Sequence, residues 1–244
     1  MKRFYGWKKQ KTDTRDFSLA LDAVTHLPPS ADLRAHCPPV YDQGELGSCT
    51  ANAIAGAFEF DLLRQGLPNF VPSRLFIYYG ERVIEGTVHE DSGAEIRDGM
   101  KVINQHGVCT EVEWPYDTAK FAHRPSAKCF TDALANRSVL YRAVRFSGIR
   151  AALAAGLPVV GGFTVFESFE SEAVAETGIV PMPTEGEQEV GGHAIMIVGY
   201  DDASQRFIVR NSWGASWGQA GYFTIPYAAF EKYGNDWWTL NTVK

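Results

Sequence analysis

The 244-residue sequence has few cysteines and no long hydrophobic run. Its four cysteines, none of them in a Cys-x-x-Cys pair, are too few for the disulfide scaffold of a small secreted domain. No segment approaches the roughly 20 apolar residues that span a bilayer, and the N-terminus lacks the apolar core of a secretory signal. We therefore expect no membrane contact. The protein should be cytoplasmic, or exported without such a signal.

Positive charge is also scarce. Lys and Arg number 23 against 29 Asp and Glu, which gives a net charge of −6, and no dense basic stripe is present. This balance argues against a nucleic-acid partner. With 45% hydrophobic residues the chain can build a sizeable core without disulfides. Its length fits one large domain or two small ones that share a cleft.

Residues 1–30 show neither helical nor strand periodicity, and Pro28-Pro29 interrupts the chain near their end. We expect them to form an extension that covers the folded body or trails from it. Residues 31–125 should form a mainly helical domain, with a helix after the N-cap Ser48 and further helices at 73–84 and 93–106.

Residues 126–244 have a β-rich pattern. Strands are expected at 138–146, 157–165, 193–200, 206–210 and 221–225, with a short helix at 147–155. Residues 167–192, rich in Pro and Glu, should form a surface loop beside a site. Because helices precede strands rather than alternating with them, the expected fold class is α+β.

Cys49 lies where the first predicted helix begins. Helix N-terminal N–H groups favour a negative charge, so this position should lower the thiol pKa and activate the sulfur as a nucleophile. A lone cysteine is more often a small buried apolar residue. The functional interpretation therefore depends on a base and a residue that orients it.

His193 and Asn211 meet that requirement. His193 begins a strongly apolar strand, whereas the other five histidines lie in loops, in turns or at a helix end. If the hairpin is centred near residue 202, Asn211 faces His193 across it. The Asn amide oxygen would then fix the tautomer of the imidazole and direct its other nitrogen outward.

Gln43 lies six residues before Cys49, and Gly44 and Gly47 allow the chain to turn back tightly between them. The Gln43 side-chain amide and the Cys49 backbone N–H could therefore bind the oxyanion of an attacked carbonyl.

Three segments, QGELGSCTANA, GGHAIMIVGYDD and VRNSWGASWGQAGYFTI, resemble the cysteine, histidine and asparagine blocks of papain-like cysteine peptidases. The resemblance runs from about Asp32 to the C-terminus. It implies a helical domain packed against an antiparallel β-barrel-like domain, with the active site in the cleft. It also implies that Cys49 is the nucleophile and that His193 is the general base and acid. Asn211 would be the orienting residue and Gln43 the oxyanion donor.

The resemblance further implies substrate-binding residues, which we take as Gly93, Ala94, Gly192 and Trp213. Ala94 departs from the family pattern, because many members have a second glycine there. Trp213 matches the indole that covers the His–Asn pair in family members. Leu46 replaces a half-cystine, so the usual first disulfide cannot form. The N-terminal extension is shorter than the typical prosegment, and we expect residues 4–27 to lie across the cleft as an inhibitory strap.

The expected activity is hydrolysis of peptide bonds through a Cys-His-Asn triad, without metal or organic cofactor, by a monomer that acts on peptides or proteins. Two alternatives remain at this stage: a same-fold acyltransferase or deamidase, and an inactive relative that only binds peptides. His106, Cys109, His123 and Cys129 supply the ligand types of a zinc site. Their spacing fits no common zinc module. Cys109 and Cys129 are better explained as buried thiols or a mutual pair.

Overall fold

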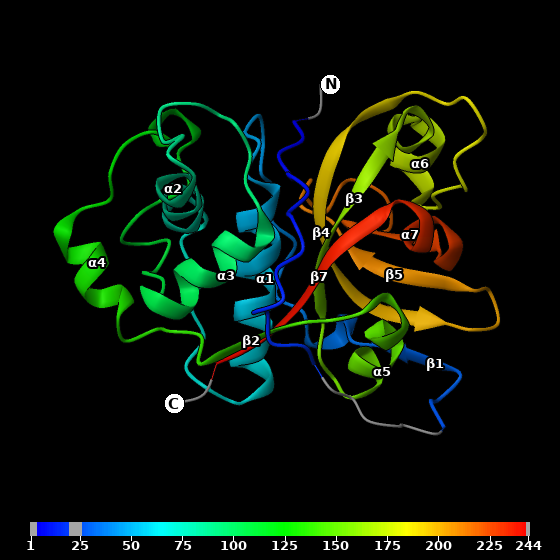
Figure 1. Ribbon diagram of the computed structural model, residues 1–244, viewed down its shortest axis with the longest axis horizontal. Helices are drawn as coiled ribbons and strands as arrows, with labels where there is room; N and C mark the ends of the chain where they lie inside the picture. The colour runs from blue at the N-terminus through cyan, green and yellow to red at the C-terminus, as the bar shows by residue number, and fades with distance from the viewer. Residues whose placement is uncertain (1–3, 20–25, 243–244) are drawn as a thin grey trace.

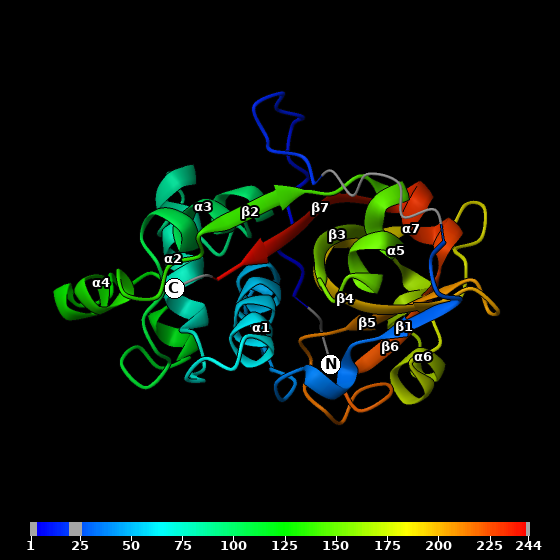
Figure 2. The same ribbon diagram turned by 90° about the horizontal axis from the view of Figure 1, so that it is seen from below.

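The computed structural model describes residues 4–19 and 26–242, which form a helical half and a β-sheet half (Figure 1). The helical half contains α1 (Cys49–Arg64), α2 (Arg74–Glu85), α3 (Ile96–Gln105) and α4 (Ala127–Ala133). The short helices α5 (Ile149–Ala154), α6 (Glu172–Thr177) and α7 (Tyr227–Tyr233) lie on the sheet side (Figure 2). No helix among the described residues is long and apolar enough to cross a membrane.

The strands form one antiparallel sheet in the order β2-β7-β3-β4-β5-β6, with β1 paired to β4. Their bounds are β1 Ser30–Asp32, β2 Leu140–Ala143, β3 Val159–Phe166, β4 Glu189–Asp201, β5 Arg206–Arg210, β6 Tyr222–Pro226 and β7 Gly234–Asn241. The α+β class is confirmed. Among the described residues β2 and β6 end the strand order, so the barrel-like sheet is open.

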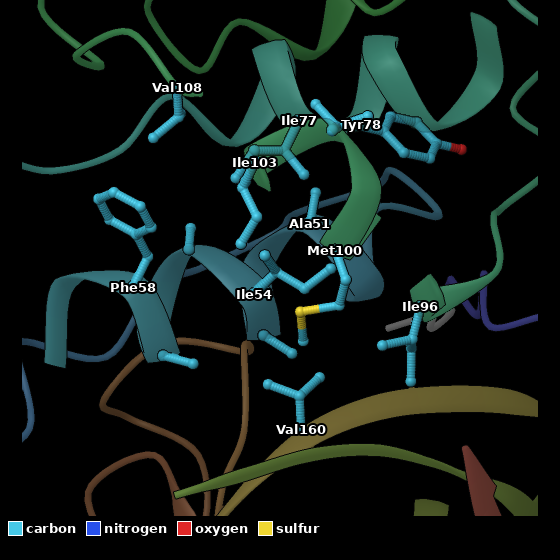
Figure 3. Packing of buried hydrophobic residues seen from close by; sticks show 14 of the residues in the cluster. Ala51, Ile54, Phe58, Ile77, Tyr78, Ile96, Met100, Ile103, Val108 and Val160 are labelled. Atoms are coloured by element: carbon cyan, nitrogen blue, oxygen red, sulfur yellow. The ribbon is translucent and has the colours of Figure 1, made fainter. Parts of the chain in front are cut away.

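Helix α1 lies between the two halves, and 14 of its residues are buried. Small side chains such as Ala51 and Ala55 let α2, α3 and β4 approach it closely. Figure 3 shows Ile54 of α1 beside Met100 of α3 and Val160 of β3. Because the helix is fixed on all sides, the position of its first residue, Cys49, is fixed as well.

The predicted helix limits agree closely with the observed ones where capping residues mark the helix ends. Helix α2 begins after Ser73, whose hydroxyl accepts a hydrogen bond from the Phe76 N–H, and ends at the left-handed Gly86. Helix α3 begins at Ile96 rather than residue 93, because Gly93 has φ +69° and cannot continue a helix.

Other elements differ from the predictions. The predicted loop 167–192 contains α6, capped by Ser171 and Gly178, and the start of β4. Helices α4 and α7 and strand β7 were not predicted. Cys129 of α4 belongs to the same buried cluster as α1, although it follows the proposed domain boundary at 125/126. The division into domains stays a prediction.

Candidate active site

Cys49 is the first residue of α1 and is fully buried, facing strand β4. Its Sγ accepts a hydrogen bond from the Ala194 N–H at 3.4 Å, so the sulfur lies next to the residue that follows His193. Ser48 precedes the helix but does not cap it with its side chain. Its hydroxyl instead contacts the Tyr116 hydroxyl at 2.5 Å and accepts from the Asn52 amide at 3.0 Å.

The predicted contact between His193 and Asn211 is present. Nε2 of His193 lies 2.8 Å from Oδ1 of Asn211, and that oxygen also accepts from the Ser212 N–H at 2.8 Å. The ring of Trp213 lies 5.0 Å from the imidazole, centroid to centroid, and both residues are buried. The imidazole is therefore held by its Nε2 edge and covered by an indole.

The strand register behind this contact differs from the prediction. Met196 pairs with Arg210 and Ile197 with Val209, after which a bulge shifts the ladder before Gly199. Asn211 follows the end of β5 and does not pair directly with His193. The Asn211 side chain nevertheless reaches the imidazole. The contact was therefore predicted correctly, although the strand register behind the prediction was wrong.

Gln43 is buried in the loop before α1, and its side-chain amide is held at both ends. Oε1 accepts from the Ser212 hydroxyl at 2.6 Å, and Nε2 donates to the Leu46 carbonyl at 2.9 Å. Nε2 also donates to the carbonyl of Phe4, in the N-terminal segment, at 3.0 Å. The predicted oxyanion donor thus already binds a peptide carbonyl.

Residues 4–8, which we call the strap, run between α1 and β4 (dark blue in Figure 1). On one side Gly6 accepts from the Ala94 N–H at 2.7 Å, and the Lys8 N–H donates to the Ala94 carbonyl at 3.0 Å. On the other side the Trp7 N–H donates to the Gly192 carbonyl at 2.9 Å.

All four residues predicted to bind substrate lie against this strap. A Cβ on Gly93 would stand 2.1 Å from the Gly6 carbonyl oxygen, and Ala94 and Gly192 bond the strap backbone. The ring of Tyr5 lies 6.2 Å from that of Trp213 and 5.8 Å from the imidazole. Their assignment to substrate stays a prediction, but a peptide segment of this chain occupies their surface.

The environment of the thiol corrects one expectation. Burial raises the pKa of Cys49 to about 11, although the N–H groups of Ala194, Gly6 and Thr50 lower it in part. The helix N-terminus was expected to lower the pKa below its usual range. With the strap in place, loss of water outweighs that effect, and the thiol is protonated at neutral pH.

Two residues that the sequence did not single out hold the loop before Cys49. The Tyr116 hydroxyl donates to the Gln43 carbonyl at 2.9 Å. The Arg74 guanidinium lies 3.8 Å from the centre of the Tyr116 ring and donates to the Asp42 carbonyl at 2.9 Å. Neither residue lies in a motif with Cys49, and no signal in the sequence joins them to it.

The cysteines and histidines of the alternative zinc site do not form a metal cluster. Within residues 4–19 and 26–242, no group of three or more His, Cys, Asp or Glu side chains is arranged to hold a metal ion. Cys109 and Cys129 are buried free thiols, and burial and the neighbouring Cys129 thiol raise the pKa of Cys109.

The sequence matches the family described as papain family cysteine protease over residues 27–235. With its α+β fold and its buried cysteine beside a His–Asn pair, the chain belongs to this family and is a papain-like cysteine protease.

Among solved structures, it is similar to xylellain, a cysteine protease from Xylella fastidiosa, with 41% identity and a TM-score of 0.91 over 100% of this chain and 99% of that one. It is 43% identical to an uncharacterized peptidase C1-like protein of Acanthamoeba polyphaga mimivirus, over 99% of this chain and 88% of that protein. It is 29% identical to cathepsin B-like CP3 of Giardia intestinalis, over 83% of this chain and 70% of that protein.

Proposed function

We propose that the protein hydrolyses peptide bonds through a thioester formed on Cys49. His193 takes the thiol proton, and the thiolate forms a C–S bond to the carbonyl carbon as an electron pair moves onto the oxygen. The Gln43 amide and the Cys49 N–H bind this oxyanion. When the C–N bond breaks, His193 gives the proton to the leaving amine. Water then hydrolyses the thioester, again with His193 as base, and restores the thiol.

The observation that carries the proposal is the hydrogen bond from Gln43 Nε2 to the Phe4 carbonyl, at 3.0 Å. This contact supports the proposed role of Gln43, because its amide N–H donates to a peptide carbonyl close to the proposed nucleophile. The contact of 2.8 Å between His193 and Asn211 supports the role of Asn211 in orienting the base. Both contacts favour peptide chemistry over the inactive alternative.

The test is cleavage of a diverse peptide library by the wild type and by Cys49→Ala, read by mass spectrometry. We expect new peptide ends that contain the oxygen of solvent water with the wild type, and none with the variant. Equal cleavage by both proteins would contradict the mechanism. Products joined to an added amine instead of water would favour the acyltransferase alternative.

We also propose that residues 4–8 keep the enzyme latent. Three contacts support this: the Phe4 carbonyl on the oxyanion donor, the Gly6 N–H on the sulfur, and the Tyr5 ring against the imidazole. A substrate would need the same positions, so it must displace the strap. The inhibitory strap predicted from the sequence extends over residues 4–27. The structure describes residues 4–19, 26 and 27 of it, and residues 20–25 lie outside the described residues.

A further inference from the structure

The carboxylate of Asp91 holds the loop that precedes Cys49. Both of its oxygens accept from the Gly47 N–H, Oδ1 at 3.1 Å and Oδ2 at 3.0 Å. Gly47 is buried, and a Cβ on it would stand only 3.1 Å from Oδ1, so glycine at this position lets the carboxylate approach the backbone closely. All four cysteines lie within the described residues and are free thiols. The loop is therefore held by hydrogen bonds and packing rather than by a disulfide.

The Asp91 carboxylate also accepts from the Tyr78 hydroxyl. That hydroxyl in turn accepts from the Gly93 N–H at 3.1 Å. Tyr78, labelled in Figure 3, is fully buried, and burial together with the Asp91 carboxylate raises the pKa of its phenol above the usual value. The hydroxyl therefore keeps the proton that it donates. This acid–phenol pair thus joins the backbone of Gly47 to that of Gly93.

Arg82 lies one helical turn after Tyr78 on α2 and fixes both members of the acid–phenol pair. Its guanidinium lies 3.9 Å from the centre of the Tyr78 ring. It also donates to the Val88 carbonyl at 2.7 Å, in the segment that leads to Asp91. Arg82 is itself fully buried. The acid–phenol pair is therefore placed by α2 rather than by the peptide that lies in the cleft.

Gly47 and Gly93 both contact Gly6 of the strap. A Cβ on Gly6 would stand 1.7 Å from the Gly47 carbonyl oxygen, and a Cβ on Gly93 would stand 2.1 Å from the Gly6 carbonyl oxygen. A peptide backbone in the cleft therefore lies against the two glycines that the acid–phenol pair joins. Cys49 follows Gly47 by two residues, and its N–H is one of the proposed oxyanion donors. A fixed separation of the two glycines thus also fixes this donor relative to the peptide.

We propose that Asp91 is a positioning residue for peptide hydrolysis, which holds the backbone of residues 47–49 at a fixed distance from the peptide-binding edge at Gly93. This inference rests on the proposed hydrolysis and adds a residue to its oxyanion site. A hydrogen bond weakens steeply as its distance and angle depart from the optimum, so an oxyanion donor must be in place before the charge develops. Without the carboxylate, the Gly47 N–H loses its acceptor, and the loop that carries the Cys49 N–H gains freedom.

The experiment measures kcat and KM in the full-length protein with Trp7→Ala, in which the strap is weakened by the loss of its buried indole. The substrate is a peptide that the library test shows to be cleaved. Asp91→Ala, Asp91→Asn and the control Glu90→Gln are each added to this background, and Glu90 is the neighbouring exposed carboxylate. Reactive Cys49 is counted by alkylation with iodoacetamide and site-resolved mass spectrometry, and kcat is expressed per reactive Cys49. A loss of folded protein alone lowers that count and leaves this kcat unchanged.

We expect Asp91→Ala to lower kcat about tenfold or more with a smaller change in KM, because the oxyanion donor loses a charge-assisted support that matters most in the transition state. Asp91→Asn keeps one oxygen that can accept from Gly47, so it should lose less. Glu90→Gln should keep the kcat of the background.

An Asp91→Ala enzyme with kcat within about twofold of the background, or an equal loss in Glu90→Gln, would overturn this inference alone. Should Asp91→Ala fail to fold, Asp91→Asn decides, and an unchanged kcat in that variant would overturn the inference as well. If the Trp7→Ala background cleaves no peptide, the proposed hydrolysis itself fails, and the inference fails with it.

Discussion

At the scale of single residues, Gln43 is the clearest test of the oxyanion hole. Its amide is fixed by Ser212 and Leu46, so it needs little reorganisation when negative charge develops. We expect Gln43→Ala to lower kcat by about 10²–10³ with a much smaller change in KM, because the lost bond is strongest in the transition state.

Steady-state kinetics on a library-derived peptide measures this effect. The control is Gln188→Ala, which removes an exposed glutamine before β4 and should leave both constants unchanged. A Gln43→Ala enzyme that keeps its kcat would show that the hydrogen bond to Phe4 has no counterpart during catalysis.

The buried thiol gives a second prediction at this scale. Since the pKa of Cys49 is about 11 with the strap docked, the thiolate fraction should rise about tenfold per pH unit between pH 7 and pH 10. Alkylation by iodoacetamide should follow the same slope, because the thiolate is the reacting form. Site-resolved mass spectrometry separates Cys49 from Cys37, Cys109 and Cys129.

Unfolded protein provides the reference, since its cysteines titrate near the usual value of about 8.5. A Cys49 alkylation rate in the native full-length protein that levels off below pH 9 would contradict the protonated state derived from burial.

At the scale of an element, the strap depends on Gly6 and Trp7. A Cβ on Gly6 would stand 1.7 Å from the Gly47 carbonyl oxygen, so Gly6→Ala forces the segment out of the cleft. Trp7→Ala removes a buried indole, which typically costs about 3–5 kcal/mol. Both variants should label with a thiol-reactive probe at pH 7 at least about 100-fold faster than the wild type.

Lys9→Ala is the matched control, because Lys9 directly follows the strap in the N-terminal extension and is exposed. It should label at the wild-type rate. Unchanged labelling of both Gly6→Ala and Trp7→Ala, in proteins that still melt cooperatively, would rule out the strap as the cause of the proposed latency.

The helices and strands also show which features of the fold could be predicted from the sequence. Helix α2 is marked by Ser73 and Gly86, local signals that do not depend on distant residues. The offset between His193 and Asn211 arises because the hairpin is centred between Ala203 and Ser204 rather than near residue 202, and a bulge then changes the register by one residue. Hydrophobic alternation reveals neither feature. Strand β7 was missed because its sequence does not alternate and is buried on both faces along much of its length.

The site divides in the same way. The positions of Cys49, His193, Asn211 and Gln43 around one site could be predicted because each residue lies in a recognisable block, and their catalytic roles stay predictions. Asp236 and Tyr116 could not, because their contacts with Trp7 and Gln43 join residues far apart in the chain. Such contacts exist only after the two halves have packed together.

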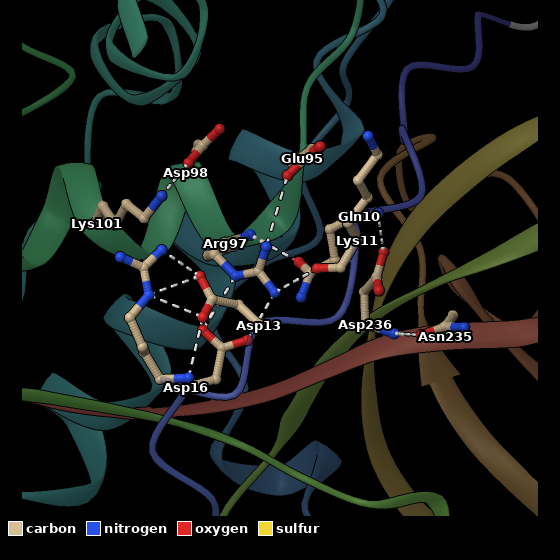
Figure 4. Close-up of polar contacts among 11 residues, drawn as sticks. Gln10, Lys11, Asp13, Asp16, Glu95, Arg97, Asp98, Lys101, Asn235 and Asp236 are labelled. Carbon is tan, nitrogen blue, oxygen red and sulfur yellow. Dashed lines mark hydrogen bonds and ion pairs between the residues drawn. The ribbon is translucent and has the colours of Figure 1, made fainter. Parts of the chain in front are cut away.

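At the scale of the whole molecule, the N-terminal segment connects both halves. It bonds the helical half through Lys8 to Glu85 and through Asp16 to Arg97, each at 2.6 Å, and the sheet half through Trp7 to Asp236 at 3.0 Å. Figure 4 shows the Arg97 cluster close to Asp236. The segment should therefore contribute to the stability of the full chain as well as to latency.

The charge on Asp236 makes that stability depend on pH. Burial raises its pKa to about 6, against 3.8 for the unperturbed carboxyl. The folded protein therefore binds this proton more tightly than the unfolded chain does. The resulting penalty is absent below about pH 4, grows as the pH rises towards 6 and is complete above it. At about 1.4 kcal/mol per pKa unit, its upper limit is about 3 kcal/mol.

Asp236→Asn removes this penalty while keeping an oxygen that accepts from Trp7 and Gln10. We expect the variant to raise Tm relative to the wild type by several degrees more at pH 8 than at pH 4.5, and calorimetry at the two pH values measures the difference. Asp202→Asn, on the same half of the molecule, should show no such increase. If Asp236→Asn shifts Tm equally at both pH values, the carboxylate carries no burial penalty in the folded protein.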